Sequence, residues 1–241
     1  MHIIFSIIYF DMKTLGLIGG STWVSTVDYY RIINQKINER AGGDNSAKLL
    51  LYSMNFQDLR SLSAGNNRKR ISDMLCDIAV KLESAGADCI LLCANTLHQY
   101  AEDVLKHINI PLIHIAEVTA IEICSKNINR IGLLGTKYTM EKDFYKDILA
   151  KYNIETLVPD KENREFIHNS IYNELGKEIF LEETKAKYIE IINKLAEKGA
   201  KGIILGCTEI PLLIEQADCS LPVFNTTLIH AQAAVEFALN D

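Results

Sequence analysis

The feature that most constrains the fold is an internal duplication. Gly16-Leu-Ile-Gly-Gly20 is echoed by Gly132-Leu-Leu-Gly-Thr136, and an apolar run that ends in a cysteine follows each motif. Cys93 follows Gly16 by 77 residues, and Cys207 follows Gly132 by 75 residues. A near-constant offset between like motifs is typical of a repeated folding unit. We therefore expect two halves with the same architecture.

Each half alternates short apolar runs with helical patterns, which predicts parallel strands joined by helices. The expected strands are residues 14–18, 48–54, 88–92 and 110–113, then 130–134, 155–158, 203–206 and 221–224. This pattern predicts an α/β fold of two pseudo-symmetric domains, each a four-stranded parallel sheet flanked by helices. We place the first domain at residues 12–116 plus 226–241, and the second at residues 117–225. Residues 55–67 are rich in Ser, Asn and Gly, and we expect a loop there.

Both cysteines stand where an apolar run gives way to polar residues and a helical pattern. Asn95 and Thr96 follow Cys93, and Thr208 follows Cys207 directly. Open α/β sheets bind ligands at the carboxyl ends of their strands. A helix start there offers N–H groups to a carboxylate and lowers the pKa of a thiol below about 8.5. One buried cysteine is often only a small hydrophobic residue, but two in matching positions favour one active site in the interdomain cleft.

Composition and charge exclude several classes of protein. The net charge of −6 argues against a nucleic-acid surface. The six cysteines include no CxxC pair and no zinc-type spacing, so we expect no metal, no disulfide framework and a cytoplasmic location. Residues 1–11 are too short to span a membrane and lack signal-peptide features. We expect translation to begin at Met12, and an added edge strand or dimer contact is the alternative for residues 1–11.

Two thiols that face each other suit proton exchange at a carbon acid. Racemisation removes a proton from one face of Cα and delivers a proton to the other face, so two groups on opposite faces need no rearrangement. General acids and bases work best with a pKa near the operating pH. Backbone N–H groups after the strands would stabilise the charge that spreads into the α-carboxylate. Cys93 and Cys207 are therefore the expected catalytic pair.

The motifs resemble those of the aspartate/glutamate racemase superfamily, and specifically its cofactor-independent aspartate racemase branch. The matching motifs are Gly16-Leu-Ile-Gly-Gly-Ser21, Cys93-Ala-Asn-Thr-Leu-His98, Gly206-Cys-Thr-Glu209 and Phe224-Asn-Thr-Thr. The resemblance covers residue 12 to the C-terminus. It implies that the two cysteines are the acid/base pair, that no pyridoxal phosphate is used, and that a homodimer acts on a small amino acid. The closing motif more often reads Phe-Asp-Thr-Thr, so Asn225 replaces a charged residue.

The resemblance also implies which residues contact the substrate. They are Gly20, Ser21, Asn95, Thr96, Thr208, Arg60 and Lys177. The polar residues Asn95, Thr96 and Thr208 match positions that hold the α-carboxylate and the amino group. Arg60 and Lys177 are the best candidates for the cations that a distal carboxylate requires. Glu209 and His98 are possible orienting groups for the two thiols, although a helix-dipole role and a core position are the simpler readings of these two residues.

Several functions remain open at this stage. Within the superfamily, the alternatives are glutamate or broad-specificity racemisation, hydantoin racemisation, and maleate isomerisation, in which a cysteine adds to the double bond. An alternative of another class is a non-catalytic amino-acid-binding protein on the same two-lobed scaffold. Asn225 is the only sequence feature that favours this last alternative.

Overall fold

The computed structural model describes residues 12–65 and 67–240, and the predictions for residues 1–11 lie outside this part. The strands of the first half are β1 (Leu15–Gly19), β2 (Leu49–Ser53) and β3 (Cys89–Leu92). Those of the second half are β4 (Arg130–Gly135), β5 (Glu155–Leu157), β6 (Ile203–Gly206) and β7 (Val223–Asn225). All pairs are parallel, in the orders β2-β1-β3 and β5-β4-β6-β7. The predicted α/β fold with two related halves is confirmed.

The first sheet has three strands, so the prediction of four strands in each sheet is wrong for this half. Leu112 forms one isolated parallel bridge to Ile90, at the place that β7 takes in the second sheet. The pairing stops there because the Leu92 carbonyl accepts the N–H of Ala94, while the N–H of Ile115 binds a histidine ring. Both groups needed for the next rung of the ladder are therefore used elsewhere.

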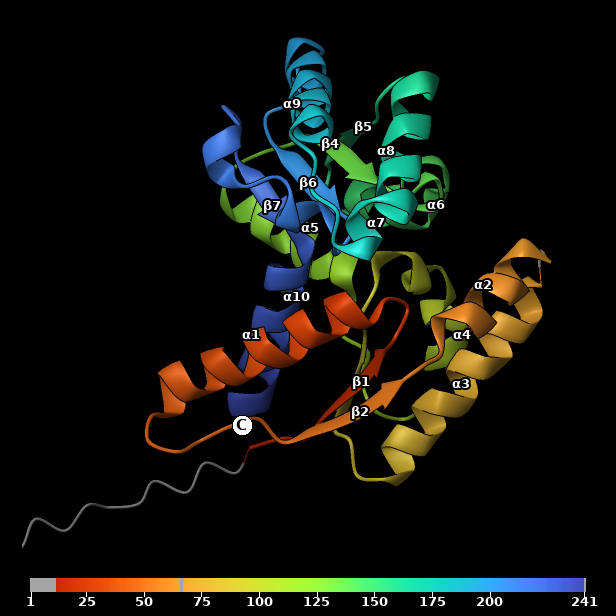
Figure 1. The fold of residues 1–241 in the computed structure, drawn as a ribbon. Coiled ribbons are helices and arrows are strands. Elements are labelled where there is room, and N and C mark those ends of the chain that lie inside the picture. The colour runs from red at the N-terminus through yellow and green to blue at the C-terminus, as the bar shows by residue number, and fades with distance from the viewer. Residues whose placement is uncertain (1–11, 66, 241) are drawn as a thin grey trace, which may run out of the picture.

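Helices cover both faces of each sheet (Figure 1). The helices of the first half are α1 (Trp23–Ala41), α2 (Phe56–Ala64), α3 (Arg68–Ser84) and α4 (Ala101–Leu105). Those that follow are α5 (Ile115–Ser125), α6 (Lys137–Glu141), α7 (Asp143–Lys151), α8 (Lys161–Asn173), α9 (Glu182–Glu197) and α10 (Thr226–Leu239). Short 3₁₀ helices are η1 (Asn95–Tyr100), η2 (Leu175–Lys177), η3 (Ile210–Leu212) and η4 (Gln216–Asp218).

The alternation of side chains along β1 shows how one strand serves two cores. Leu15 and Leu17 pack against α1 and α10, whereas Ile18 packs against α3 on the other face. Helix α10 therefore returns from β7 to the first sheet, and Figure 1 shows it running from the second half down beside α1. The proposed boundaries at residues 116 and 225 remain a prediction.

Helix α2 lies where the sequence predicts a loop. The side chain of Asn55 accepts the N–H of Gln57 at 3.3 Å and so caps the helix. Leu59 is buried in the core under β1 and α3, and this burial outweighs the low helix propensity of the serines. The prediction of a loop is wrong because only three apolar residues occur at helical spacing, and so few do not stand out in a polar segment.

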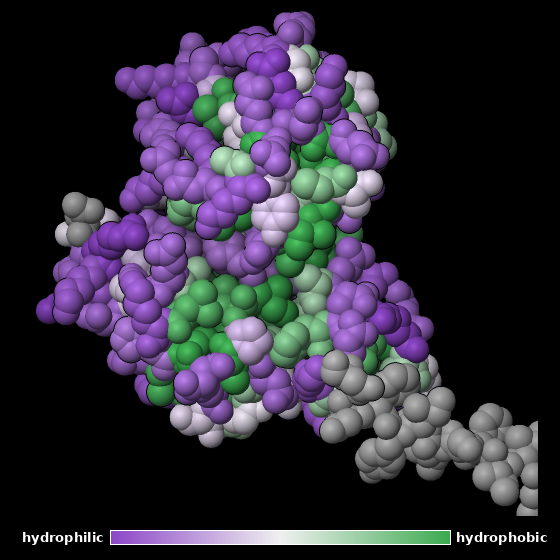
Figure 2. All heavy atoms as spheres, turned by 180° about the vertical axis from the view of Figure 1, so that it is seen from behind, coloured by the Kyte–Doolittle hydropathy of each residue, from purple (hydrophilic) through white to green (hydrophobic). Residues whose placement is uncertain are grey.

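The surface differs between the halves. Seen from behind, hydrophilic residues cover most of the second half, whereas hydrophobic residues reach the surface over much of the first half (Figure 2). No helix in residues 12–65 or 67–240 is long and apolar enough to cross a membrane.

Candidate active site

The carboxyl ends of the two sheets face each other, and side-chain hydrogen bonds join them. Thr22, after β1, donates its hydroxyl proton to Glu209 Oε1, after β6, at 2.5 Å. The hydroxyls of Thr96, after β3, and Thr136, after β4, lie 3.2 Å apart. These contacts bring together loops that the sequence separates by up to 187 residues. Each loop that carries a cysteine is thus bonded to a loop of the other half.

Asn95 presents an unused acceptor inside this site. Its side-chain nitrogen donates to the Thr226 hydroxyl at 3.0 Å, at the start of α10. Its Oδ1 atom is buried and has no partner among the described residues, and the same holds for the Thr227 hydroxyl. Buried polar groups in folded proteins nearly always have a partner. A ligand with N–H or O–H groups would satisfy both atoms.

Glu209 accepts several hydrogen bonds in the second cysteine motif. Its Oε2 atom accepts hydrogen bonds from the Cys207 thiol at 2.9 Å and from the Thr208 hydroxyl at 2.8 Å. With Thr22 on Oε1, this carboxylate, which is only 3% exposed, has donors on both oxygens. Such a set of donors suits an ionised carboxylate, which accepts hydrogen bonds but cannot donate them. Glu209 thus lies beside Cys207 and is hydrogen-bonded to its thiol, which is the position that an orienting group would take.

Cys207 is 8% exposed, and its pKa is raised well above the usual thiol value. Burial is the main cause, followed by the negative charge of Glu209 and the hydrogen bond to it. Backbone N–H groups of Thr208 and Glu209 lower the pKa, but by less than these three effects raise it. The resting form of Cys207 is therefore the thiol.

Cys93 directly follows β3 and is fully buried, with its thiol 4.0 Å from the Leu91 carbonyl. Burial raises its pKa, so the sequence-based expectation of a lowered thiol pKa is wrong in this state for both cysteines. The cause is that only the short 3₁₀ helices η1 and η3 follow the cysteines, and few peptide dipoles align there. Desolvation consequently decides the outcome.

His98 holds the loop after Cys93. Its Nε2 atom accepts the N–H of Ile115 at 3.1 Å, and its Nδ1 atom lies 3.1 Å from the Ala94 carbonyl. These partners require the Nδ1–H tautomer, because a carbonyl can only accept. His98 therefore joins the loop after Cys93 to the start of α5, and its ring is buried, as the simpler reading of the sequence expects.

The pH dependence of stability is expected to come largely from His98, His114 and His230. Their rings lie 4.6 and 5.5 Å apart, measured from His98 to the other two. Burial holds the pKa of His98 well below its usual range and lowers those of His114 and His230 to about 4. The unfolded chain therefore binds more protons below the free histidine pKa of about 6.5, and the free energy of unfolding should fall as the pH drops from 6.5 to 4.

Urea unfolding between pH 4 and 7.5 measures this slope. His114→Asn keeps a side chain that can cap α5, and it should flatten the slope by about a third if the three histidines contribute equally. His107→Asn, at an exposed position, is the matched control and should leave the slope unchanged. An unaltered slope in His114→Asn would remove this histidine from the account.

The structure places the two predicted cations differently. Arg60 is exposed on α2, and its guanidinium carbon lies 6.0 Å from the ring centre of Tyr172 on α8. Arg60 thus reaches the second half of the molecule. Lys177 is exposed at the end of η2. Neither cation has a carboxylate within 4.0 Å in the described part of the chain.

Gly20 and Ser21 form the turn that leads into α1. The N–H of Gly20 donates to the Thr26 hydroxyl at 2.8 Å, so this group is already occupied. Ser21 is partly exposed beside Thr22, the N-cap of α1. Asn225 has a comparable role, because its side chain accepts the N–H of Leu228 at 3.1 Å and caps α10. The replacement of aspartate at this position therefore keeps the cap.

Sequence reasoning missed several residues of the site. They are Thr22, Thr136, Tyr172, Thr226 and Thr227. Four of them are threonines that directly follow or closely follow a strand, which is a signal that the sequence carries. Tyr172 lies on a helix and reaches the site only through the tertiary fold.

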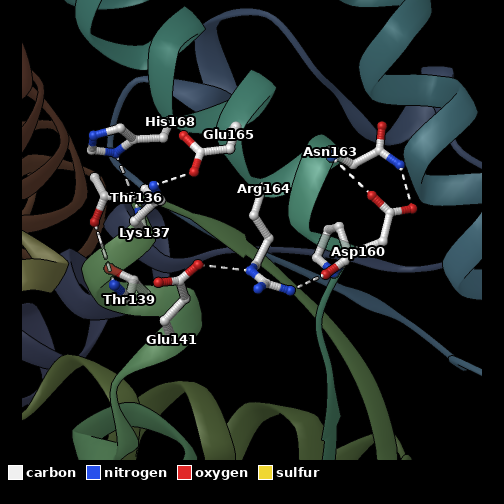
Figure 3. Close-up of polar contacts among 10 residues, drawn as sticks. Thr136, Lys137, Thr139, Glu141, Asp160, Asn163, Arg164, Glu165 and His168 are labelled. Carbon is white, nitrogen blue, oxygen red and sulfur yellow. Dashed lines mark hydrogen bonds and ion pairs between the residues drawn. The ribbon is translucent and has the colours of Figure 1, made fainter.

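The open hollow of the second half lies beside this site. It has a volume of about 470 Å³ and is lined by residues that include Lys137, Glu141, Arg164 and Glu165. Figure 3 shows that ion pairs bridge it, with Lys137 bound to Glu165 and Arg164 to Glu141 at 2.9 Å. Within residues 12–65 and 67–240, no three His, Cys, Asp or Glu side chains are placed to hold a metal ion.

Comparison with known proteins gives consistent results. A Yersinia pestis protein described as a candidate Asp/Glu racemase is 46% identical, with a TM-score of 0.90 over 95% of this chain and 100% of that chain. An aspartate racemase homologue from Pyrococcus horikoshii OT3 is 34% identical, with a TM-score of 0.80 over 94% of this chain and 99% of that chain. The broad specificity amino-acid racemase RacX of Bacillus subtilis is 26% identical over 161 residues, which are 67% of this chain and 69% of the relative.

The family match extends over almost the whole described chain. Residues 18–234 match the Asp/Glu/hydantoin racemase family, and this range includes both cysteine motifs and every bridge between the two sheets. The solved structures share the two-sheet arrangement as well. This chain is an isomerase that belongs to the Asp/Glu/hydantoin racemase family.

Proposed function

We propose that this racemase interconverts L- and D-aspartate without a cofactor, with Cys93 and Cys207 as the two acid/base groups. The observation that carries the proposal is that each cysteine-bearing loop is bonded to a loop of the other half. Glu209, two residues after Cys207, is bonded to Thr22, and Thr96, three residues after Cys93, is bonded to Thr136. The likeness to the aspartate racemase homologue from Pyrococcus horikoshii supports aspartate as the substrate.

In the resting state both cysteines are thiols, so one of them must lose a proton before the reaction begins. Glu209 lies 2.9 Å from the Cys207 sulfur and can take its proton, which leaves a thiolate beside a neutral carboxyl group. The substrate ammonium would favour that thiolate, because an opposite charge nearby stabilises the charged form. The thiolate removes the Cα proton, and Cys93 delivers its own proton to the opposite face. In the reverse direction the two thiols exchange roles.

The polar groups around the thiols fit an amino acid. The unused Oδ1 of Asn95 would accept a hydrogen bond from the substrate ammonium, and the Thr227 hydroxyl would donate one to a carboxylate oxygen. Thr96 and Thr208 add hydroxyls at the same edge. These groups account for the part that all amino acids share, so they do not choose among substrates.

The distal carboxylate of the substrate would be bound by one of the two predicted cations. Arg60 is the nearer candidate, since it reaches Tyr172 across the site, and Lys177 is the second. A guanidinium binds a carboxylate through two parallel hydrogen bonds. Aspartate, glutamate and a wider range of amino acids differ only in this part of the site, so specificity is decided here.

The substrate-selecting role of Arg60 can be measured against asparagine, the neutral isostere of aspartate. Arg60→Ala should lower kcat/KM for aspartate by about 10- to 100-fold through KM, since hydrogen bonds to charged groups contribute about 1.5–3 kcal/mol. Any turnover of asparagine should change little. Arg68→Ala is the matched control, because Arg68 is also an arginine of the first half that stacks on a tyrosine ring, at 5.0 Å from Tyr100. An unchanged preference for aspartate in Arg60→Ala would exclude this role.

Other reactions of the family are separated by the same assay. Glutamate, hydantoins and maleate replace aspartate in turn, and the substrate with the highest kcat/KM identifies the reaction.

The expected homodimer also remains a proposal. Trp23, Val27 and Tyr30 lie on one exposed face of α1, next to an exposed edge strand that carries Leu51, and such an apolar face fits a second copy of the chain.

A further inference from the structure

Arg60 is held between two aromatic rings, one from each half of the molecule. Its guanidinium carbon lies 5.9 Å from the ring centre of Phe56, one turn earlier on α2, and 6.0 Å from that of Tyr172 on α8. These distances are within the range of cation–π attraction. No hydrogen bond or ion pair to another described residue uses the guanidinium N–H groups, so the rings hold the group and leave its donors available.

Tyr172 is firmly placed and lies next to the chemistry. The ring of His168 packs edge-on against it at 4.8 Å, and His168 Nδ1 accepts the N–H of Lys137. The pKa of Tyr172 is raised to about 12, mainly by burial, with smaller contributions from nearby groups that include Glu209, whereas Arg60 acts to lower it. The phenol is therefore neutral at physiological pH and stands between Arg60 and the Cys207 motif.

The contact depends on how the two halves are arranged. Cys93 is fully buried and Cys207 is almost so, so the structure describes a closed site. Helices α5 and α10 join the halves through extensive contacts, whereas α2 and α8 meet through the side chains of Arg60 and Tyr172. In this closed arrangement the Tyr172 ring lies 6.0 Å from the Arg60 guanidinium carbon.

We propose that Tyr172 is a positioning residue that holds Arg60 in place for the distal carboxylate of the substrate, and so sets the preference for acidic over neutral amino acids. This inference rests on the proposed function, in which Arg60 binds that carboxylate. The ring is the active part of the residue, and the hydroxyl is not needed. Because the effect acts on a remote part of the substrate, it should change KM for aspartate rather than kcat.

Steady-state kinetics on aspartate and asparagine test the inference. Tyr172→Leu should lower kcat/KM for aspartate about tenfold, mostly through KM, and leave any asparagine turnover within about twofold. Tyr172→Phe should retain the parent preference. Tyr138→Leu is the matched control, since Tyr138 is an exposed tyrosine of the same half whose ring contacts Lys142 at 5.2 Å. It should leave the preference unchanged.

A double-mutant cycle separates positioning from a general structural role. In the Arg60→Ala background, Tyr172→Leu should have no further effect on aspartate kinetics. The inference is overturned if Tyr172→Leu lowers both substrates equally, or if its effect persists without Arg60, while Arg60→Ala alone still raises KM for aspartate. If Arg60→Ala alone changes nothing, or the parent does not racemise aspartate, then the proposed function fails and the inference fails with it.

Discussion

Alanine at either Cys93 or Cys207 is expected to lower kcat for racemisation by at least about 10³-fold, because general acid–base groups typically contribute 10²–10⁴-fold. Each thiol serves one face of Cα, so neither can replace the other. The two variants should therefore be similarly inactive in both directions, L to D and D to L. Circular dichroism at a fixed wavelength follows the loss of optical rotation directly.

A third buried cysteine provides the control for these variants. Cys89 lies in β3, four residues before Cys93, is fully buried, and has a pKa raised to about 12 by burial. Cys89→Ala removes a similar volume from the same strand and should keep kcat within a few-fold of the parent. If Cys93→Ala and Cys89→Ala lost the same activity, packing rather than chemistry would explain the loss.

Gly20→Ala is expected to lower the free energy of unfolding by about 3 kcal/mol or more. Gly20 has φ of +83°, and a Cβ atom there would lie 2.2 Å from the Met54 carbonyl oxygen and 2.4 Å from the Met54 nitrogen. A left-handed conformation costs roughly 1–2 kcal/mol for an L-residue. The clash adds more, because it is with backbone that cannot rotate away.

Gly43→Ala separates the two contributions. Gly43 has φ of +56°, and nothing lies within 4 Å of a Cβ atom there, so only the conformational cost of roughly 1–2 kcal/mol is expected. Urea unfolding followed by circular dichroism compares both variants with the parent. Equal losses at the two glycines would show that the approach of Met54 is not close. Because Met54 leads into α2, Gly20→Ala should also raise KM for aspartate by displacing Arg60.

The repeated motifs predict the topology well, because two copies of the same local sequence pattern fold with the same order of strands. The placement of Cys93 and Cys207 directly after strands follows from that repeat and is present in the structure, as is a hydrogen bond between each cysteine-bearing loop and the other half. That the two cysteines act at one site stays a prediction. The number of strands in the first sheet could not be predicted, since it depends on which N–H group donates to the carbonyl of Leu92.

The electrostatics of the site were harder to predict than its location. A strand end followed by a helix pattern predicts a lowered thiol pKa, but the burial of Cys93 and Cys207 acts in the opposite direction and is larger. Burial is a tertiary property that local sequence does not report. The same holds for Tyr172, whose position beside Arg60 arises only when α2 and α8 meet.

Solvent exchange at Cα tests the two-base proposal most directly. The protein is incubated with L-aspartate in D₂O, and the Cα–H signal is followed by proton NMR together with circular dichroism. The proposal predicts that the Cα–H signal disappears as the optical activity decays, and that Cys93→Ala and Cys207→Ala each abolish inversion. Exchange that proceeds without inversion in the parent would contradict two opposed thiols, and the absence of any exchange with aspartate would contradict aspartate as the substrate.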